Sequence, residues 1–211
     1  YDLLNEPNWT FEGKDKNGRQ DATNQPIWEI YKAITKAIRS VDTNHIIIVE
    51  GNAWGNNYNG FPGPWDDNMV ISFHKYWNPN TQEAIARFLN LREKFHMPLW
   101  LGESGENTTQ WFSECVRLVE KNRIGWAWWP YKKVSSGTSI MTAKRPDDFK
   151  KIVDYWNKTG ERPSKEVASK GLFELVENLK TENCRVNTNV VQSLIAPDSK
   201  PLAGFEDKNH P

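Results

Sequence analysis

The sequence predicts an α/β fold with a parallel sheet that helices cover on both faces. Short, continuously apolar runs recur along the chain, for example at His45–Gly51 and Met69–Tyr76. Strands without a polar face are typical of parallel sheets. Segments with the 3.6-residue apolar period of a helix separate these runs, and this alternation predicts a series of strand–helix units.

Five strands are predicted, at Tyr1–Leu4, His45–Gly51, Met69–Tyr76, Leu99–Leu101 and Ile124–Trp129. Apolar runs this short, bounded by proline and glycine, favour strands over helices. Because the carboxyl ends of parallel strands meet at one edge of a sheet, the polar residues that follow them are expected to lie close together.

Helices are predicted between and after these strands. Pro26 begins one that extends to Val41, and Thr81 caps the next. The remaining helical segments are 111–119, 147–158, 164–180 and 187–196. The composition shifts after residue 159, so the last two helices are expected to form an extension at 161–196, followed by a flexible tail at 197–211.

The composition excludes some classes of function. Lys+Arg and Asp+Glu number 27 each, and this balance argues against a nucleic acid or an anionic membrane as partner. No apolar run approaches the length of a membrane span. Two cysteines, Cys115 and Cys184, exclude a disulfide scaffold, and the sequence leaves open whether they pair. Eleven tryptophans are unusual, and exposed ones would hold the apolar faces of sugar rings.

Two carboxylates follow predicted strands in a similar way. Glu6 ends the run that begins at Tyr1, and Glu103 follows Gly102 at the end of the fourth run. Two carboxylates at the ends of two parallel strands are the arrangement that glycoside hydrolysis requires. A surface or loop carboxylate is the alternative for each of them.

Four motifs occur in order at successive strand ends: Leu4–Pro7 (LNEP), His74–Tyr76 (HKY), Leu101–Glu103 (LGE) and Gly125–Trp129 (GWAWW). Together they resemble the C-terminal portion of a glycoside hydrolase family 5 enzyme, the family of cellulases and related β-glycanases. The resemblance covers residues 1–160 and implies a (β/α)8 barrel, represented here by strands 4–8.

The resemblance implies a role for each matching residue. Glu6 would be the acid/base, and Glu103 the nucleophile of a retaining mechanism. Tyr76 would donate a hydrogen bond to the nucleophile. The expected substrate-binding residues are Asn5, which would contact the sugar 2-hydroxyl, His74, which would line the subsite of the cleaved sugar, and Trp129, which would form the platform beneath it.

Other assignments stay open at this stage. Asn5 alternatively forms a turn before proline, and His74 is alternatively a structural histidine. Trp54, Trp65 and Trp77 lie in loops at the same end, where they would either form outer platforms or pack against the loops. Glu50 is interpreted as a supporting or solvated carboxylate. The four histidines have no ligand spacing, so neither a metal nor a cofactor is expected.

The expected function is hydrolysis of a β-linked polysaccharide by an endo-β-1,4-glucanase. A β-mannanase, a xylanase, an exo-β-glucosidase and a non-catalytic carbohydrate-binding relative are the alternatives. The first half of the barrel, with an Arg and a His of the active site, is expected upstream of Tyr1, together with a signal peptide. The enzyme is therefore expected to be extracellular or periplasmic, and inactivity of this piece alone is an open alternative.

Overall fold

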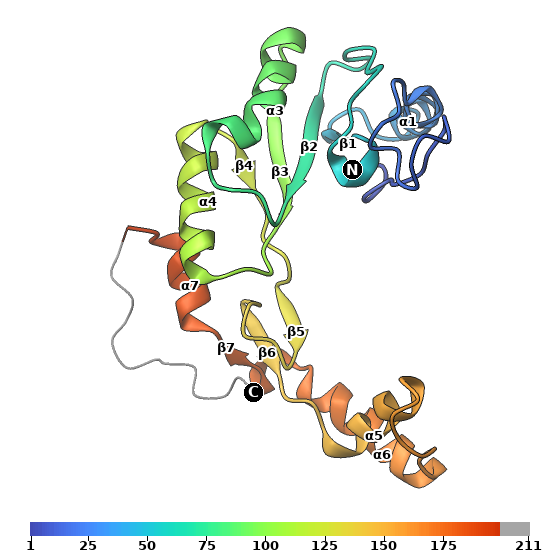
Figure 1. Cartoon of the computed structure of the whole chain (residues 1–211), viewed down its shortest axis with the longest axis vertical. Coiled ribbons are helices and arrows are strands. Elements are labelled where there is room, and N and C mark those ends of the chain that lie inside the picture. Colours follow the sequence, from blue (N-terminus) through green and yellow to red (C-terminus); the bar gives the residue numbers. More distant parts are fainter. Residues whose placement is uncertain (199–211) are drawn as a thin grey trace. The chain divides into compact units, whose positions relative to one another are not determined.

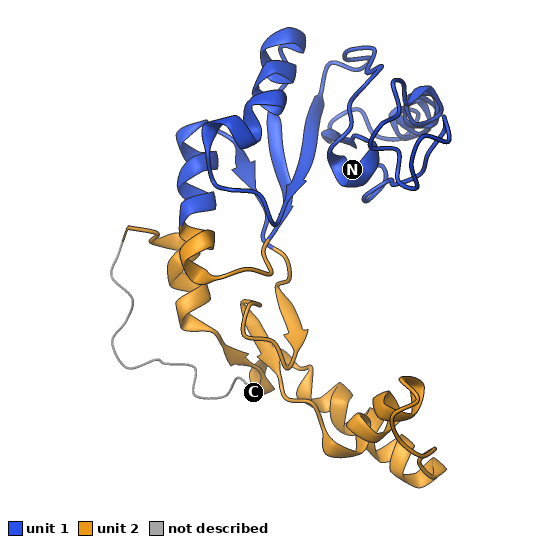
Figure 2. Ribbon diagram, in the orientation of Figure 1, with its two compact units in different colours: residues 1–104, 114–128 blue, residues 105–113, 129–211 orange. Residues whose placement is uncertain are grey.

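The computed structural model describes residues 1–198 (Figure 1). The chain forms two compact units: unit 1 comprises residues 1–104 and 114–128, and unit 2 comprises residues 105–113 and those from 129 onward (Figure 2). The boundary expected at residue 160 falls inside unit 2, and the functional domain boundaries stay a prediction. The expected tail lies, apart from its first two residues, outside the described residues.

Unit 1 contains a four-stranded sheet in the order β1-β2-β3-β4. All three pairings are parallel. The strands are β1 (Ile47–Glu50), β2 (Met69–Lys75), β3 (Leu99–Ser104) and β4 (Gly125–Trp126). This arrangement confirms the predicted α/β class with a parallel sheet.

The segment predicted as a strand at Tyr1–Leu4 lies parallel to β1 and exchanges backbone hydrogen bonds with Ile48, but it is exposed and forms less than a regular strand. Only Asp2 forms a bridge, with Ile48, while Tyr1 is 52 % and Leu4 is 44 % exposed. Among the described residues this segment pairs on one side only, so its side chains are not enclosed. The strand predicted at Ile124–Trp129 is also shorter, because the chain passes from unit 1 into unit 2 at Trp129.

The helices α1 (Gln25–Arg39), α3 (Gln82–Phe95) and α4 (Thr109–Lys121) confirm the helical predictions, with Thr81 accepting a capping hydrogen bond from Ala84 N. α1 ends before the predicted Val41, which is 86 % exposed. The apolar strand side chains pack against these helices. Phe73 of β2, for example, stacks on Phe88 of α3 with the ring centroids 4.1 Å apart.

Unit 2 contains a small sheet that the sequence did not predict. It consists of β5 (Lys132–Val134), β6 (Met141–Ala143) and β7 (Arg185–Val186). The predicted helices are present as α5 (Asp147–Trp156), α6 (Lys165–Asn178) and α7 (Thr188–Ile195), with a 3-10 turn at Thr181–Asn183. A Cβ at Gly171 of α6 would lie 2.5 Å from Phe149 N, so glycine permits close packing of α5 and α6.

Cys115 is a buried free thiol in α4, and Cys184 is also free. None of the helices within residues 1–198 combines the length and the apolar composition that crossing a membrane would require.

Candidate active site

The carboxyl ends of β1, β2 and β3 place three ionisable side chains at one edge of the sheet. Glu50 ends β1, His74 lies near the end of β2, and Glu103 lies near the end of β3. The register shifts between Phe73 and His74, so that His74 pairs with Glu103 and Gly102 is skipped. Bulges of this kind redirect side chains near active sites, and here the bulge brings an imidazole beside a carboxylate.

Glu6 reaches the same edge from the chain that precedes α1. Its φ of 47° is left-handed, although the residue before a proline normally adopts an extended conformation. Such strain costs of the order of 1–3 kcal/mol and needs support from the surroundings. Support comes from Glu50, whose Oε2 accepts a hydrogen bond of 2.9 Å from the backbone N–H of Glu6. The α2 turn (Asn52–Gly55) follows directly after β1.

His74 lies among three carboxylates. Its Nδ1 is 2.8 Å from Glu6 Oε1 and 3.6 Å from Glu103 Oε2, and its Nε2 is 2.8 Å from Glu50 Oε1. Burial alone would lower the pKa of His74, but the interactions with Glu50, Glu6 and Glu103 outweigh burial and raise the pKa to about 9. His74 is therefore an imidazolium near neutral pH and compensates the charge of the fully buried Glu50.

Glu6 and Glu103 are brought together by this arrangement. One carboxylate oxygen of each lies within 4.8 Å of the other and of a His74 ring nitrogen. The Tyr76 hydroxyl donates a 2.7 Å hydrogen bond to Glu103 Oε2. A hydrogen bond to a carboxylate oxygen stabilises its ionised form. The geometry therefore provides a pair of neighbouring carboxyl groups, one of which is oriented by a phenol.

The same three residues, Glu6, His74 and Glu103, also present ligand atoms close enough to surround a metal ion. A histidine binds a metal through a deprotonated ring nitrogen. Because the pKa of His74 is raised to about 9, a metal ion would have to displace a proton from its ring near neutral pH.

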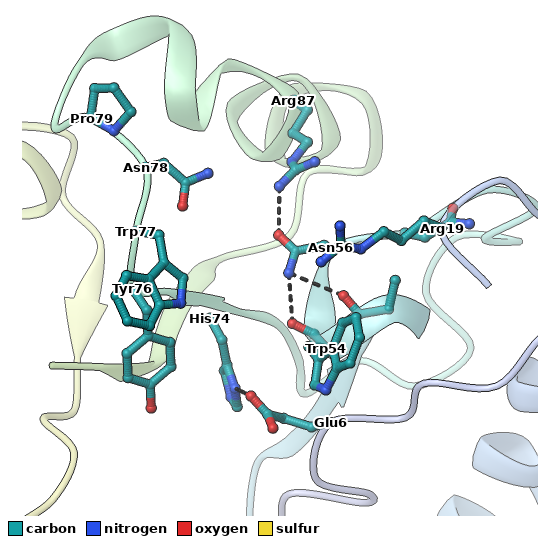
Figure 3. A pocket seen from close by; sticks show the side chains of 12 residues that line it. Glu6, Arg19, Trp54, Asn56, His74, Tyr76, Trp77, Asn78, Pro79 and Arg87 are labelled. Atoms are coloured by element: carbon teal, nitrogen blue, oxygen red, sulfur yellow. Dashed lines mark hydrogen bonds and ion pairs between the residues drawn. The ribbon is translucent and has the colours of Figure 1, made fainter. Parts of the chain in front are cut away.

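Trp54 and Trp77 line a cavity of about 830 Å³ that also reaches Glu6, His74 and Tyr76 (Figure 3). Trp77 is 81 % exposed and offers its ring to the solvent. Trp54 is half-buried and its ring lies beside the Arg19 guanidinium, so Trp77 is the more accessible of the two tryptophans.

Trp65 instead packs among its neighbours. Its ring lies 5.9 Å from that of Phe61, and its indole N–H donates to Thr35. Loop packing is therefore the role that the contacts of Trp65 support.

The contacts described above do not involve two of the predicted site residues, Asn5 and Trp129. The side chain of Asn5 is exposed and forms no hydrogen bond with other residues of the described chain. Trp129 belongs to unit 2 and is 49 % exposed. Their roles in substrate binding stay predictions.

Three residues of this region were missed or undervalued by the sequence analysis. Glu50 is a buried partner of His74 rather than a solvated carboxylate, and its place at the end of an apolar strand was an available signal. Arg19 and Arg87 line the cavity. Neither arginine belongs to a strand end, and no local motif marks them.

A model of the cellulase family, glycosyl hydrolase family 5, matches residues 1–135. An endoglycoceramidase of Hydra vulgaris is 33 % identical over 147 residues, which are 63 % of this chain and 28 % of that protein. The chain therefore spans less than a third of the curated relative that it matches.

Solved structures of the same kind share the fold. The cellulose synthase subunit Z of Clostridioides difficile superimposes with a TM-score of 0.56 at 19 % identity, covering 92 % of this chain and 60 % of that one. The endoglucanase Cel5A of Thermotoga maritima gives 0.53 at 21 % identity, covering 92 % and 58 %. The family match covers more than half of the sequence and contains the strand ends that carry Glu6, His74 and Glu103. The chain belongs to glycosyl hydrolase family 5.

Proposed function

We propose that the whole protein is a retaining endo-β-glycanase, most simply an endo-β-1,4-glucanase, with Glu6 as acid/base and Glu103 as nucleophile. The observation that carries this proposal is the close approach of the two carboxyl groups, of which one oxygen each lies within 4.8 Å of the other. Retaining glycosidases hold their carboxyl groups about 5–5.5 Å apart, whereas inverting enzymes need about 6.5–9.5 Å to admit a water molecule.

In the proposed first step, Glu103 attacks the anomeric carbon while Glu6 gives its proton to the departing glycosidic oxygen. The C–O bond to the leaving sugar breaks, and an ester bond to Glu103 forms. In the second step Glu6, now a carboxylate, takes a proton from water as the water oxygen attacks the anomeric carbon. The ester bond breaks, Glu103 regains its charge, and the product keeps the configuration of the substrate.

The surrounding residues suit these steps. Tyr76 stabilises the ionised nucleophile through its hydrogen bond to Glu103. His74 fixes Glu6 from one side, while Glu50 holds the Glu6 backbone. Asn5 and Trp129 belong to the proposal as contacts to the 2-hydroxyl and the face of the cleaved sugar.

A β-1,4-glucan is favoured as substrate because one solved structural neighbour, Cel5A of Thermotoga maritima, is described in complex with cellobiose. A second candidate is a glycolipid, because the Hydra relative is an endoglycoceramidase. We further propose that additional strand–helix units complete the barrel, since the four parallel strands are half of the eight that it needs. We also propose an extracellular or periplasmic location, because a polymeric substrate does not cross the cell membrane.

The test assays the whole protein on soluble β-glucan, mannan, xylan and a glycosylceramide, with proton NMR to identify the first anomer released. We expect β-glucan to be hydrolysed with release of the β-anomer, and both Glu103→Gln and Glu6→Gln to lose at least about a thousandfold in kcat. Glu106→Gln is a matched control, because this carboxylate pairs with Lys133 in unit 2. Initial release of the α-anomer, or full activity of Glu103→Gln, would contradict the mechanism.

A further inference from the structure

The cavity beside Glu6 lies on one side of the carboxylate pair. Its lining includes Glu6 together with His74 and Tyr76 but not Glu103, and from these residues it extends to Trp54, Asn56 and Arg87. The acid/base contacts the glycosidic oxygen, which leaves with the departing sugar. The cavity of about 830 Å³ is therefore placed to hold the leaving-group part of the substrate.

Two arginines enter this cavity from different elements. Arg19 comes from the loop before α1, and Arg87 comes from α3; Figure 3 shows both side chains directed toward Asn56. Neither guanidinium has a carboxylate within ion-pair distance among residues 1–198. Glu6 is the only carboxylate in the lining of this cavity.

The environment of Arg87 leaves its charge uncompensated. Its guanidinium lies over the Phe88 ring, 4.6 Å from the centroid, and donates to Asn56 Oδ1 at 2.5 Å. Arg87 is an exposed residue that lines the cavity, so its guanidinium is accessible to an anion and would form charge-assisted hydrogen bonds with it.

Arg19 is oriented by an aromatic side chain. Its guanidinium carbon lies 5.2 Å from the centroid of the Trp54 ring. Stacking of this kind holds the planar group while leaving its N–H donors available.

The backbone of this wall is strained. Ala53 and Trp54 both adopt left-handed conformations, with φ of 53° and 58°. Asn56 Nδ2 donates to both of their carbonyl oxygens, at 3.1 and 2.8 Å, and Trp54 N donates to Pro7 O. Strained non-glycine residues persist where the surroundings hold them, and they cluster at ligand sites. Here the strain presents Trp54 and Asn56 to the cavity between the two arginines.

We propose that this arginine wall, formed by Arg19, Trp54, Asn56 and Arg87, binds an anionic substituent of the sugar on the leaving-group side of the cleaved bond. The proposal rests on the proposed acid/base role of Glu6. A carboxylate or a sulfate ester has the charge and the acceptor oxygens that guanidinium groups recognise. Trp54 would contact the apolar face of the same sugar.

The test compares two disaccharides that differ only at one carbon. Cellobiose and β-glucosyl-1,4-glucuronic acid are titrated calorimetrically into the whole protein carrying Glu103→Gln, which prevents turnover. We expect the uronic acid to bind about tenfold more tightly at low salt, as one charge-assisted interaction provides. Because screening weakens exposed charge pairs, this ratio is expected to fall in 0.5 M salt, a measurement that needs no further substitution.

Substitutions then test whether the arginine wall causes the preference for the uronic acid over cellobiose. Arg19→Gln together with Arg87→Gln is expected to bring the ratio to about one, and Arg87→Lys to retain part of it. Arg123→Gln removes the same charge from an exposed position outside the cavity and is expected to keep the ratio. If Arg87 only supported Asn56, cellobiose and the uronic acid would lose affinity equally.

Equal affinity for the two sugars, including no measurable binding of either, overturns this inference, as does a ratio that survives the double substitution. The proposed catalytic function fails on a different result, namely hydrolysis that persists in Glu103→Gln.

Discussion

Glu50 Oε1 lies 2.8 Å from His74 Nε2, and the other oxygen of Glu50 accepts a hydrogen bond from the backbone N–H of Glu6. One fully buried carboxylate thus contacts the imidazolium and also restrains the strained residue proposed as acid/base. A buried ion pair is a weak source of stability, but removing one partner leaves an unpaired charge. We therefore interpret Glu50 as a positioning residue for Glu6 and His74.

Replacing Glu50 by Gln keeps its shape and removes its charge. Burial then opposes ionisation of His74 with less compensation, so the pKa of His74 is expected to fall clearly below its value of about 9. NMR titration of the imidazole signals measures this shift. Glu83→Gln, at an exposed site in the first turn of α3, is the control. A pKa of His74 that stays near 9 in Glu50→Gln would show that Glu6 and Glu103 are enough to raise this pKa without Glu50.

The raised pKa of His74 also predicts how stability depends on pH. Because the folded value of about 9 exceeds the ordinary 6.5, the stabilisation is fully present below pH 6.5 and is lost as the pH rises through 9. Lys75, whose pKa burial lowers to about 8, contributes with the opposite sign from about pH 8 upward. Burial raises the pKa of Asp2 to about 6, so the contribution of Asp2 to the free energy of unfolding changes with pH only below about pH 6. The informative interval is therefore pH 6.5–8.

Urea denaturation across this interval provides the measurement. The free energy of unfolding is expected to fall with a slope of up to about 1.4 kcal/mol per pH unit. In Glu50→Gln the slope should be much smaller. A wild-type profile that is flat or rises between pH 6.5 and 8 is incompatible with an ionised His74 in this site.

The Tyr76 hydroxyl donates to Glu103 Oε2 at 2.7 Å, and Tyr76→Phe removes the hydroxyl that makes this hydrogen bond. Hydrogen bonds to charged groups contribute about 1.5–3 kcal/mol, so kcat/KM is expected to fall by about 10- to 100-fold. Steady-state kinetics on the best substrate of the panel measures the loss. Tyr155→Phe, at an exposed position of α5 in unit 2, should change it less than about twofold. A Tyr76→Phe enzyme with wild-type kcat/KM would remove Tyr76 from the mechanism.

Much of unit 1 could be predicted because its signals are local. Apolar runs at His45–Gly51 and Met69–Tyr76 form β1 and β2, and Thr81 caps α3 as expected. The position of Glu103 beside His74 followed from the general rule that parallel strands present their carboxyl ends together.

The features that escaped prediction depend on contacts between distant residues. The strands β5 and β6 have three residues each, and two-residue β7 pairs with β6 from more than forty positions later in the sequence. Segments of two or three residues are too short to show the alternation of apolar and polar residues that predicts a strand. Arg19 and Arg87 lie 68 positions apart in the sequence, and they line the same cavity only because the chain folds around the α2 turn. The sequence likewise assigned Trp129 to a strand that the structure divides between the units.

Gly102 provides the last prediction, because it is the residue skipped where the β2–β3 register shifts. A Cβ at this position would collide with Ser72 Oγ and lie 3.2 Å from His74 Nε2. Gly102→Ala is therefore expected to destabilise the protein by about 1–3 kcal/mol and to displace His74 from Glu50. Thermal denaturation and the NMR-determined pKa of His74 measure the two effects.

A second substitution separates these effects. Ser72 Oγ is buried without a hydrogen-bond partner among residues 1–198, so Ser72→Ala removes the closer obstacle at little cost. In Ser72→Ala/Gly102→Ala, part of the lost stability should return, while the pKa of His74 should stay lowered because the new methyl group still contacts its ring. Wild-type stability and an unchanged pKa of His74 in Gly102→Ala alone would show that the sheet edge adapts, and that the close approach of Gly102 to His74 is not required for the site.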